Sequence, residues 1–382
     1  MRRQVMNILV CLTVALLAIP ARADELQAFL EATLKSAREK HHLPAVAALV
    51  QMSGHIAAEG VLGVRAEGQA EGVTTSDLWH IGSDTKAFTA TMIARLVDRG
   101  VMKFEDTMAV CFPNDAANMN AAYRNVTVAQ LLSHMAGLPA LMDDKELPSY
   151  FAAIKGITEI KAQRAALVRS YLSQAPALKP GTEFSYSNLG FVIAGAAAER
   201  RTGKSWEYLV RSEVFQPLGI THAGFGAPGS SASIDQPRGH ALKDGKLVAL
   251  DPESKDADNP PSFGPAGTIH ISLHDWMLFA QDQLDGAHGH GKLLKPETYR
   301  RLHTPISSNG VYAMGWGAKL GLDGVPLLLT HTGSNGFWVA DIRIFPQHNI
   351  ITLVATNAGG DDAEKAVNEA RKALSDSLHP ID

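Results

Sequence analysis

Strand-like segments occur at both ends of this 382-residue chain, and helix-like segments lie between them. The strand-like segments are residues 45–52, 56–65, 325–331, 336–345 and 350–357. The dipeptide Ser53-Gly54 separates the first two and is typical of a hairpin turn. Because the strand-like segments from the two ends of the chain need a common core, we expect them to form one sheet. We therefore predict an α+β fold: an antiparallel sheet built from both chain ends and flanked by helices, with an inserted, mostly α-helical domain.

The helix-like segments show apolar residues at helical spacing between Pro and Gly breaks. They are residues 24–40, 83–100, 127–134, 189–202, 206–214, 272–284, 296–302 and 361–378. We place the α/β part at 24–82 and 310–378 and the mostly helical part at 83–309, which together form one domain over 24–378. Residues 226–263 are polar and Pro-rich, and we expect them to form a long surface excursion.

The first 23 residues have the features of a signal peptide. Arg2 and Arg3 precede an apolar run from about residue 8 to residue 20, and Ala21-Arg22-Ala23 matches an A-x-A cleavage site. The apolar run is short for a membrane span, so we expect a secreted or periplasmic protein. A retained membrane anchor is the alternative.

Charge and cysteine content exclude several classes of protein. The net charge is −4, and removal of the three arginines in the first 23 residues makes it −7. No basic stripe with interleaved aromatic residues is present, which argues against nucleic-acid binding. Cys11 would leave with the signal peptide, so Cys111 would have no disulfide partner and would serve as a small apolar filler. His288 and His290 lack a third ligand at a suitable spacing, so we expect no metal and no cofactor.

Ser83-Asp84-Thr85-Lys86 is the only Ser-x-x-Lys sequence in the chain. On a helix, this spacing places the Ser83 and Lys86 side chains one turn apart on the same face. A serine hydroxyl becomes a good nucleophile when a nearby base takes its proton, and a lysine can do this if its pKa is lowered. Taken alone, the motif could equally mark a capped surface helix.

Two further motifs follow, Tyr186-Ser187-Asn188 and His331-Thr332-Gly333. By itself, the first could be an ordinary turn before a helix, and His331 could be a strand histidine whose hydrogen bonds are satisfied. No G-x-S-x-G, P-loop or HExxH sequence is present, which argues against several other enzyme classes.

The chain resembles the serine β-lactamase and penicillin-binding protein family, in its class C β-lactamase and D-alanyl-D-alanine carboxypeptidase branch. The stretches that carry the resemblance are IGSDTKAFTATMIARLVDRG (81–100), VTVAQLLSHMAGLP (126–139), PGTEFSYSNLGFVIAGAAAERRTGKSWEYLV (180–210), PLGITH (217–222), GPAGTIHISLHDWMLFAQ (264–281) and HTGSNGFW (331–338). The resemblance covers about residues 25–378 and implies a β-lactamase/transpeptidase-like fold.

The resemblance also implies roles for individual residues. Ser83 would be the nucleophile, Lys86 its activating partner and Tyr186 the group that moves a proton to the leaving group. Asn188 would hydrogen-bond the substrate amide. The backbone N–H groups of Ser83 and Ser334 would form the oxyanion hole.

The third motif departs from the Lys-Thr-Gly that β-lactamases of this type usually carry. In the family, this strand lines the site and contacts a substrate carboxylate, which here assigns substrate binding to His331, Thr332 and Gly333. Histidine is mostly neutral near pH 7 and would hold a carboxylate less strongly than lysine does.

We therefore expect a hydrolase of amides or esters, most like a D-Ala-D-Ala carboxypeptidase, a D-aminopeptidase or an esterase. A class C-type β-lactamase and a weakly active penicillin-binding protein are the alternatives. The expected partner is a small-molecule or peptide substrate, which could be peptidoglycan-derived or a β-lactam.

Overall fold

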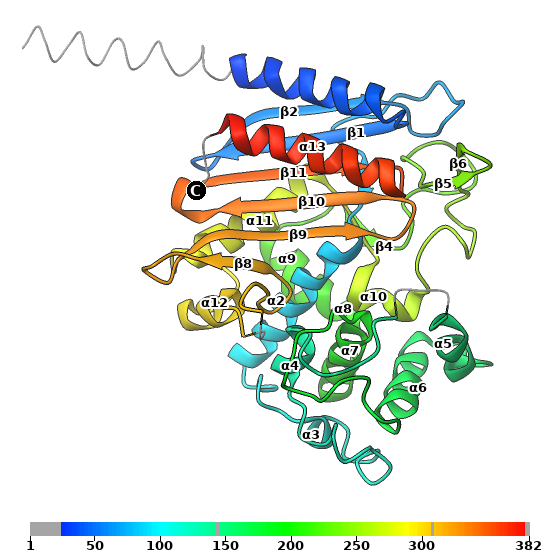
Figure 1. The fold of residues 1–382 in the computed structure, drawn as a ribbon, viewed down its shortest axis with the longest axis vertical. Helices are drawn as coiled ribbons and strands as arrows, with labels where there is room; N and C mark the ends of the chain where they lie inside the picture. Colours follow the sequence, from blue (N-terminus) through cyan, green and yellow to red (C-terminus); the bar gives the residue numbers. More distant parts are fainter. Residues whose placement is uncertain (1–23, 142–144, 307–308, 379–382) are drawn as a thin grey trace, which may run out of the picture.

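The computed structural model describes residues 24–141, 145–306 and 309–378. Within these residues, the main sheet has six antiparallel strands in the order β2-β1-β11-β10-β9-β8. Their bounds are β1 (Ala45–Met52), β2 (His55–Gly63), β8 (Gly317–Leu320), β9 (Pro326–Ser334), β10 (Val339–Phe345) and β11 (Ile350–Thr356). The two chain ends meet at the centre of the sheet because β1 pairs with β11 (Figure 1). The predicted fold class is confirmed, whereas β8 was not predicted.

The first hairpin forms where the sequence indicated. Ser53 and Gly54 both have positive φ angles, 50° and 82°, as a two-residue type I′ turn requires. The turn sets a register in which Met52 lies opposite His55.

Helices cover both faces of the sheet, and the alternation along β1 explains its continuous apolar sequence. Ala45, Ala47 and Leu49 join the large core on the side of the inserted helices. Val46, Ala48 and Val50 join a second core beneath the N-terminal helix, residues 24–40, and α13 (Asp361–Ser377). These two helices come from opposite ends of the chain and lie on the same face of the sheet (Figure 1).

The inserted part is mostly helical, as expected. Its helices are α2 (Thr85–Asp98), α3 (Met108–Cys111), α4 (Val128–Leu132), α5 (Leu147–Ile154), α6 (Ile160–Leu172), α7 (Asn188–Thr202), α8 (Trp206–Val210), α9 (Gln216–Leu218), α10 (Gly264–Gly267), α11 (Leu273–Ala287) and α12 (Pro296–His303). Thr127 caps α4 in a capping box with Gln130, and Gly203 ends α7 in the left-handed conformation. The helix α11 contacts β10 and β11, so this part of the insertion also covers the sheet.

The middle of the chain also contains short strands. β3 (Leu78–His80), β7 (Ile269–Ser272) and β4 (Ala223–Phe225) form a small sheet in the order β3-β7-β4. β5 (His240–Lys243) and β6 (Lys246–Ala249) form a hairpin within the expected surface excursion.

That excursion is more firmly attached to the molecule than its polar sequence indicated. The His240 ring is fully buried, and its Nε2 accepts the Glu67 backbone N–H at 2.9 Å. Its other ring nitrogen lies 2.6 Å from the Asn357 carbonyl oxygen. One histidine therefore ties the excursion to the loops beside the main sheet.

Two expectations from the N-terminal half have different outcomes. The predicted signal peptide, residues 1–23, lies outside the described residues. Among the residues that are described, no helix is long and apolar enough to cross a membrane. Cys111 is buried, and this burial raises the pKa of its thiol to about 12, which confirms its role as an apolar filler.

Candidate active site

Ser83 lies in a 3₁₀ turn, Gly82–Asp84, between β3 and the start of α2. Gly82 has a φ of 48°, and a Cβ atom at this position would come within 2.4 Å of the Ser334 backbone nitrogen. Glycine is thus required both for the turn and for the close approach of β9. The turn presents Ser83 to a cleft at the edge of β9.

Lys86 occupies the first turn of α2, and its ammonium-bearing end is completely buried. Its Nζ lies 2.9 Å from Ser83 Oγ, 2.8 Å from Asn188 Oδ1 and 2.7 Å from the Ala266 carbonyl oxygen. Burial lowers the pKa of Lys86 well below its ordinary value, although the charge of Asp84 opposes this shift. The structure thus favours the neutral amine.

The orientation of Asn188 fixes what the lysine amine can do. The amide Nδ2 donates to the Leu141 carbonyl at 3.1 Å, so Oδ1 must face Lys86. A neutral amine can donate its two N–H groups to Asn188 Oδ1 and the Ala266 carbonyl, since both can only accept. The nitrogen lone pair then remains for the Ser83 hydroxyl, which is the arrangement a general base requires.

Tyr186 immediately precedes the Ser187 cap of α7. The Ser187 Oγ accepts the Gly190 N–H at 3.2 Å, and the Ser187 N–H donates to His134 Nδ1 at 3.0 Å. The His134 ring packs against the Tyr186 ring with their centroids 4.2 Å apart. His134 thus holds the tyrosine motif in place.

Tyr186 and Ser83 line the same cleft, and the Ser83 side chain is close enough to influence the pKa of the phenol. Burial raises the pKa of Tyr186 well above its ordinary value, and Ser83 opposes this shift only in part. Lys86 Nζ lies 5.0 Å from the centre of the Tyr186 ring. At neutral pH, Tyr186 is therefore a phenol beside the nucleophile, able to donate a proton.

The third motif lies on β9 beside the nucleophile, with the His331 ring almost completely buried. Its Nδ1 lies 3.0 Å from the Thr332 carbonyl oxygen and 3.3 Å from Asp84 Oδ1, so that nitrogen carries the proton. Its Nε2 then accepts from the Tyr312 hydroxyl at 3.0 Å. Burial, helped by the positive charge of Lys86, lowers the pKa of His331 to about 3. The imidazole is neutral at pH 7.

The Thr332 hydroxyl is engaged by an acidic side chain of the next strand. Thr332 Oγ1 donates to Asp341 Oδ2 at 2.7 Å, across the β9–β10 pair. Arg371 of α13 approaches the same carboxylate, with Nε 3.6 Å from Oδ2. Burial raises the pKa of Asp341 to about 7, although the Thr332 bond and the Arg371 charge act against it.

Asp84, inside the Ser-x-x-Lys motif, is a second buried carboxyl group. Neither of its oxygens makes a hydrogen bond with the described residues, and the 3.3 Å approach of His331 Nδ1 to Oδ1 is an electrostatic contact only. Burial and the charge of Asp341 raise the pKa of Asp84 well above its ordinary value, and Lys86 lowers it only in part. Burial therefore shifts the pKa of both Asp84 and Asp341 upward, toward their protonated forms.

The backbone around Ser83 and Ser334 is packed closely enough to form one anion site. A Cβ atom at Gly333 would lie 2.0 Å from the Ile81 carbonyl oxygen and 2.7 Å from the Ser83 nitrogen. Ser83, Gly333 and Ser334 all line the same cleft. The geometry is thus compatible with an oxyanion hole made by the two serine N–H groups, a role that stays a prediction.

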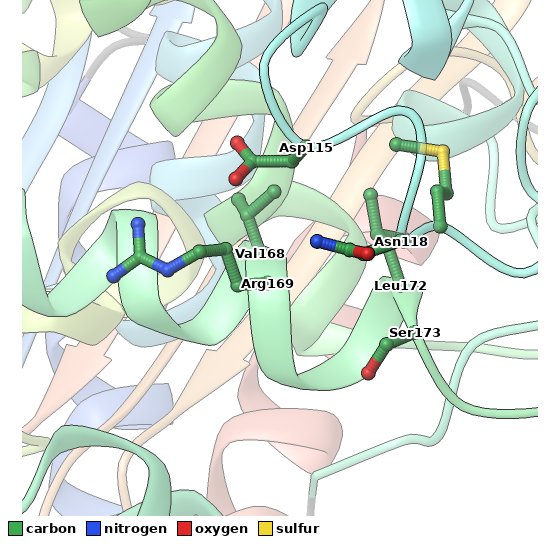
Figure 2. A pocket seen from close by; sticks show the side chains of 7 residues that line it. Asp115, Asn118, Val168, Arg169, Leu172 and Ser173 are labelled. Atoms are coloured by element: carbon green, nitrogen blue, oxygen red, sulfur yellow. The ribbon is translucent and has the colours of Figure 1, made fainter.

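The cleft has a volume of about 760 Å³ and extends from Ser83 to α13. Tyr186, His331 and Thr332 line one part of it, and Asn368 and Arg371 line the other. A second, much smaller cavity of about 60 Å³ lies between α6 and the segment around Asp115 (Figure 2). None of the predicted site residues lines that cavity.

The structure brings all the predicted site residues together: Ser83, Lys86, Tyr186, Asn188, His331, Thr332, Gly333 and Ser334. Asn188 contacts Lys86, and its expected contact with substrate stays a prediction. The residues that the sequence analysis did not assign to the site are Asp84, Tyr312, Asp341, Asn368 and Arg371. Of these, only Asp84 could have been noticed, because it lies within a motif.

The described residues contain no group of three His, Cys, Asp or Glu side chains that could hold a metal ion. His288 Nε2 lies 3.0 Å from the Pro346 carbonyl oxygen, which attaches that loop to the turn after β10. This contact gives His288 a structural partner.

Comparisons with known proteins match nearly the whole chain. A family model described as Beta-lactamase matches residues 30–376. Penicillin-binding protein 4 of Amycolatopsis lactamdurans is 29% identical over 340 residues, covering 84% of this chain and 83% of that protein. Protein flp of Staphylococcus aureus (strain N315) is 23% identical, covering 86% of this chain but only 62% of that protein.

Solved structures agree with the fold. The crystal structure of SurE has a TM-score of 0.72 and 23% identity, covering 94% of this chain and 76% of SurE. The octameric penicillin-binding protein homologue from Pyrococcus abyssi also has a TM-score of 0.72, with 22% identity, covering 92% of this chain and 77% of that one. At these identities the likeness concerns the fold alone.

Proposed function

Because the chain belongs to the beta-lactamase family, we propose that it is an exported serine hydrolase that cleaves an amide or ester through an acyl-enzyme on Ser83. One observation carries the proposal: the buried Lys86 amine, its pKa lowered by burial, lies 2.9 Å from Ser83 Oγ. A lysine that merely paired with a surface acid would not have a lowered pKa, because a neighbouring negative charge favours the ammonium form.

The proposed acylation moves two protons. Lys86 Nζ takes the proton of Ser83 as Oγ bonds to the acyl carbon, and the carbonyl oxygen becomes an oxyanion at the Ser83 and Ser334 N–H groups. As the bond to the leaving group breaks, Tyr186 donates its phenolic proton to the departing nitrogen or oxygen. The Lys86 ammonium, close to the Tyr186 ring, then returns the serine proton to the Tyr186 phenolate, so that both groups are neutral again.

Deacylation repeats these steps with water. As water attacks the acyl carbon, the Tyr186 hydroxyl takes a proton from the water and passes its own proton to the Lys86 amine. The Ser83 Oγ–acyl bond then breaks, and Oγ takes a proton back. The enzyme returns to its starting protonation state, and the products are an acid and the free amine or alcohol.

The strand β9 favours a peptidase or esterase over a potent β-lactamase. His331 supplies no positive charge at pH 7, and the Thr332 hydroxyl is already donated to Asp341. Neither group is therefore available to anchor a carboxylate strongly. The cleft does contain Arg371, which keeps a class C-type β-lactamase as the second candidate. A weakly active penicillin-binding protein is the third, in line with the name of the Amycolatopsis relative.

One experiment tests the proposal. The mature chain is incubated with nitrocefin, a p-nitrophenyl ester and a D-Ala-D-Ala peptide, and intact mass is followed over time. We expect ester or peptide turnover and a persistent β-lactam adduct. Rapid nitrocefin turnover would instead identify a β-lactamase. No adduct and no turnover with any probe, or activity that survives Ser83→Ala, would reject the proposal.

Export is a separate part of the proposal and rests on the signal-like sequence of residues 1–23. Fractionation of expressing cells, with N-terminal sequencing of the product, tests it. We expect a periplasmic or secreted protein that starts at Asp24. A cytoplasmic product that retains Met1–Ala23 would contradict it.

A further inference from the structure

Asp258 lies in the polar excursion before α10, a region in which the sequence indicated no functional residue. Its side chain is about one-tenth exposed. The single oxygen Oδ1 lies 2.9 Å from His80 Nε2 and 2.7 Å from Asn335 Nδ2, and it also accepts the Asn259 N–H at 2.7 Å. One carboxylate thus touches segments that are far apart in the sequence.

The first of these segments leads to the nucleophile. His80 is the last residue of β3, and its ring is completely buried. Its Nδ1 accepts the Gly82 N–H at 3.1 Å, so the ring proton must be on Nε2, facing Asp258. The contact between His80 and Asp258 is electrostatic rather than a directed hydrogen bond. It holds a ring that fixes the backbone directly before Ser83.

The second segment carries the other expected oxyanion donor. Asn335 follows Ser334, the last residue of β9. The Asn335 Nδ2 donates to Asp258, and its Oδ1 accepts the Phe337 N–H at 3.1 Å. The side chain therefore fixes the turn that leaves β9 and links it to Asp258.

The Ser83 segment and the Ser334 segment lie so close together that a small displacement of either would change the separation of their N–H groups. A Cβ atom at Gly82 would lie 2.4 Å from the Ser334 nitrogen, and one at Gly333 would lie 2.7 Å from the Ser83 nitrogen. Two backbone N–H groups can stabilise one oxyanion only if their separation is held constant. A misplacement of about 1 Å can cost about 10²-fold in rate.

We infer that Asp258 is a positioning residue that links the Ser83 segment, through His80, to the Ser334 segment, through Asn335, and so sets the geometry of the oxyanion hole. The inference rests on the proposed acyl-enzyme chemistry and adds to it a residue that contacts neither substrate nor nucleophile. Asp258 acts on the transition state because the oxyanion forms only there.

The test compares Asp258→Ala with Asp258→Asn, using the ester that the wild-type enzyme hydrolyses and phenylboronic acid as an inhibitor. The boronate forms a tetrahedral adduct on serine and so reports on the oxyanion hole. We expect Asp258→Ala to lower kcat by about 10-fold to 10²-fold with little change in KM. The inhibition constant of the boronate should rise by a similar factor. Asp258→Asn keeps an acceptor for Asn335 and should recover most of both.

Asp256→Ala is the matched control, because Asp256 is an exposed acid in the same loop. Asn335→Ala removes the donor on the other side and should give the Asp258→Ala pattern, which keeps the test decisive if Asp258→Ala does not fold. Unchanged kcat in both alanine variants, or a loss that appears only in KM, would overturn the inference. Absence of Ser83 acylation in the wild-type protein would instead reject the proposed function.

Discussion

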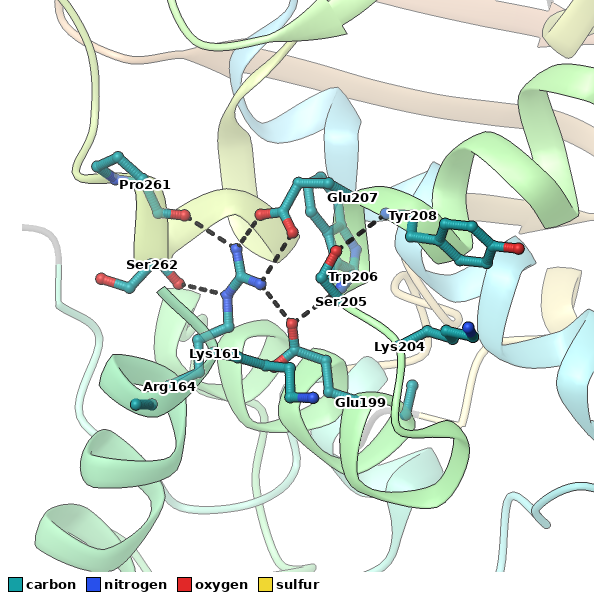
Figure 3. A network of polar contacts seen from close by, with 12 residues as sticks. Lys161, Arg164, Glu199, Lys204, Ser205, Trp206, Glu207, Tyr208, Pro261 and Ser262 are labelled. Atoms are coloured by element: carbon teal, nitrogen blue, oxygen red, sulfur yellow. Dashed lines mark hydrogen bonds and ion pairs between the residues drawn. The ribbon is translucent and has the colours of Figure 1, made fainter. Parts of the chain in front are cut away.

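Two clusters of buried charge lie in the inserted part of this molecule and beside it, and they differ in how fully their charges are paired. In the arginine cluster, Arg164 donates to Glu199 at 2.6 Å and to Glu207 at 2.5 Å (Figure 3). It also donates to the carbonyl oxygens of Ser262 and Pro261 at 3.1 and 2.9 Å. Burial raises the pKa of Glu207, but the bond and charge of Arg164 outweigh it, so the net shift is downward.

The catalytic cluster consists of Ser83, Asp84, Lys86, His331 and Asp341, and its charges are poorly paired. Burial dominates there: it lowers the pKa of Lys86 and raises that of Asp84. The comparison teaches that pairing in a buried ion cluster offsets the effect of burial: Arg164 gives Glu207 a net lowered pKa, whereas burial still leaves the pKa of Glu199 raised. An under-satisfied cluster favours neutral forms, which can exchange protons.

The largest expected effect is on the chemistry of the catalytic cluster. Lys86→Arg replaces an amine that can lose its proton with a guanidinium that cannot. We expect the rate of Ser83 acylation to fall by about 10²-fold to 10⁴-fold, measured by stopped-flow or intact mass. Lys372→Arg, on the exposed face of α13, is the control. Acylation of Lys86→Arg at the wild-type rate would show that Lys86 is not the base.

The arginine cluster should affect stability instead. Arg164→Met leaves Glu199 buried without its partner, and we expect a loss of about 3–5 kcal/mol in the free energy of unfolding, measured with urea. Adding Glu199→Gln should restore part of this loss, because it removes the unpaired charge. An unchanged unfolding midpoint for Arg164→Met would contradict the expectation that the arginine cluster contributes to stability.

Asp341 should make stability depend on pH. Its native pKa of about 7 exceeds its ordinary value of 3.8, so the native state binds more protons between these values. Its contribution to stability is therefore present at acid pH and is lost as the pH rises through 7. Relative to Asp341→Asn, the wild-type protein should lose about 2–4 kcal/mol between pH 5 and pH 8. Parallel stability curves for the two proteins would contradict this, and Asp376→Asn serves as a surface control.

The smallest effect is expected at an exposed ion pair. Glu369 pairs with Lys40 at 2.8 Å between α13 and the N-terminal helix, where water screens both charges. We expect Glu369→Gln to change the free energy of unfolding by less than about 1 kcal/mol, measured by thermal and urea unfolding. A loss as large as that of Arg164→Met would mean that burial does not distinguish these pairs.

The sequence predicted the fold well where the signals are local. The Ser53-Gly54 turn, the helix that begins at Thr127 and the strand-like segments of β9 to β11 each depend on a few neighbouring residues. The segment 226–263 was less predictable, because His240 is buried by contacts with Glu67 and Asn357, which are distant in the sequence.

In the candidate active site, too, only the relations between neighbouring residues could be predicted. Ser83 and Lys86 are one helical turn apart, so their proximity could be predicted from spacing. Asp341 and Arg371 reach the site from β10 and α13, and no local pattern indicates where such residues point. The lowered pKa values of Lys86 and His331 were also beyond the sequence, because they arise from burial that only tertiary packing creates.

The pairing of β1 with β11 has a consequence for the order of assembly. The Ala45 N–H bonds Asn357 Oδ1 across a separation of 312 residues, so the centre of the sheet can close only when almost the entire chain is present. Contacts between residues so far apart in the sequence form late in folding. In a growing or unfolded chain, Ser83 would be present long before β9 could pack beside it. The proposed acyl-transfer chemistry would thus be absent during synthesis and would begin only when the chain has folded.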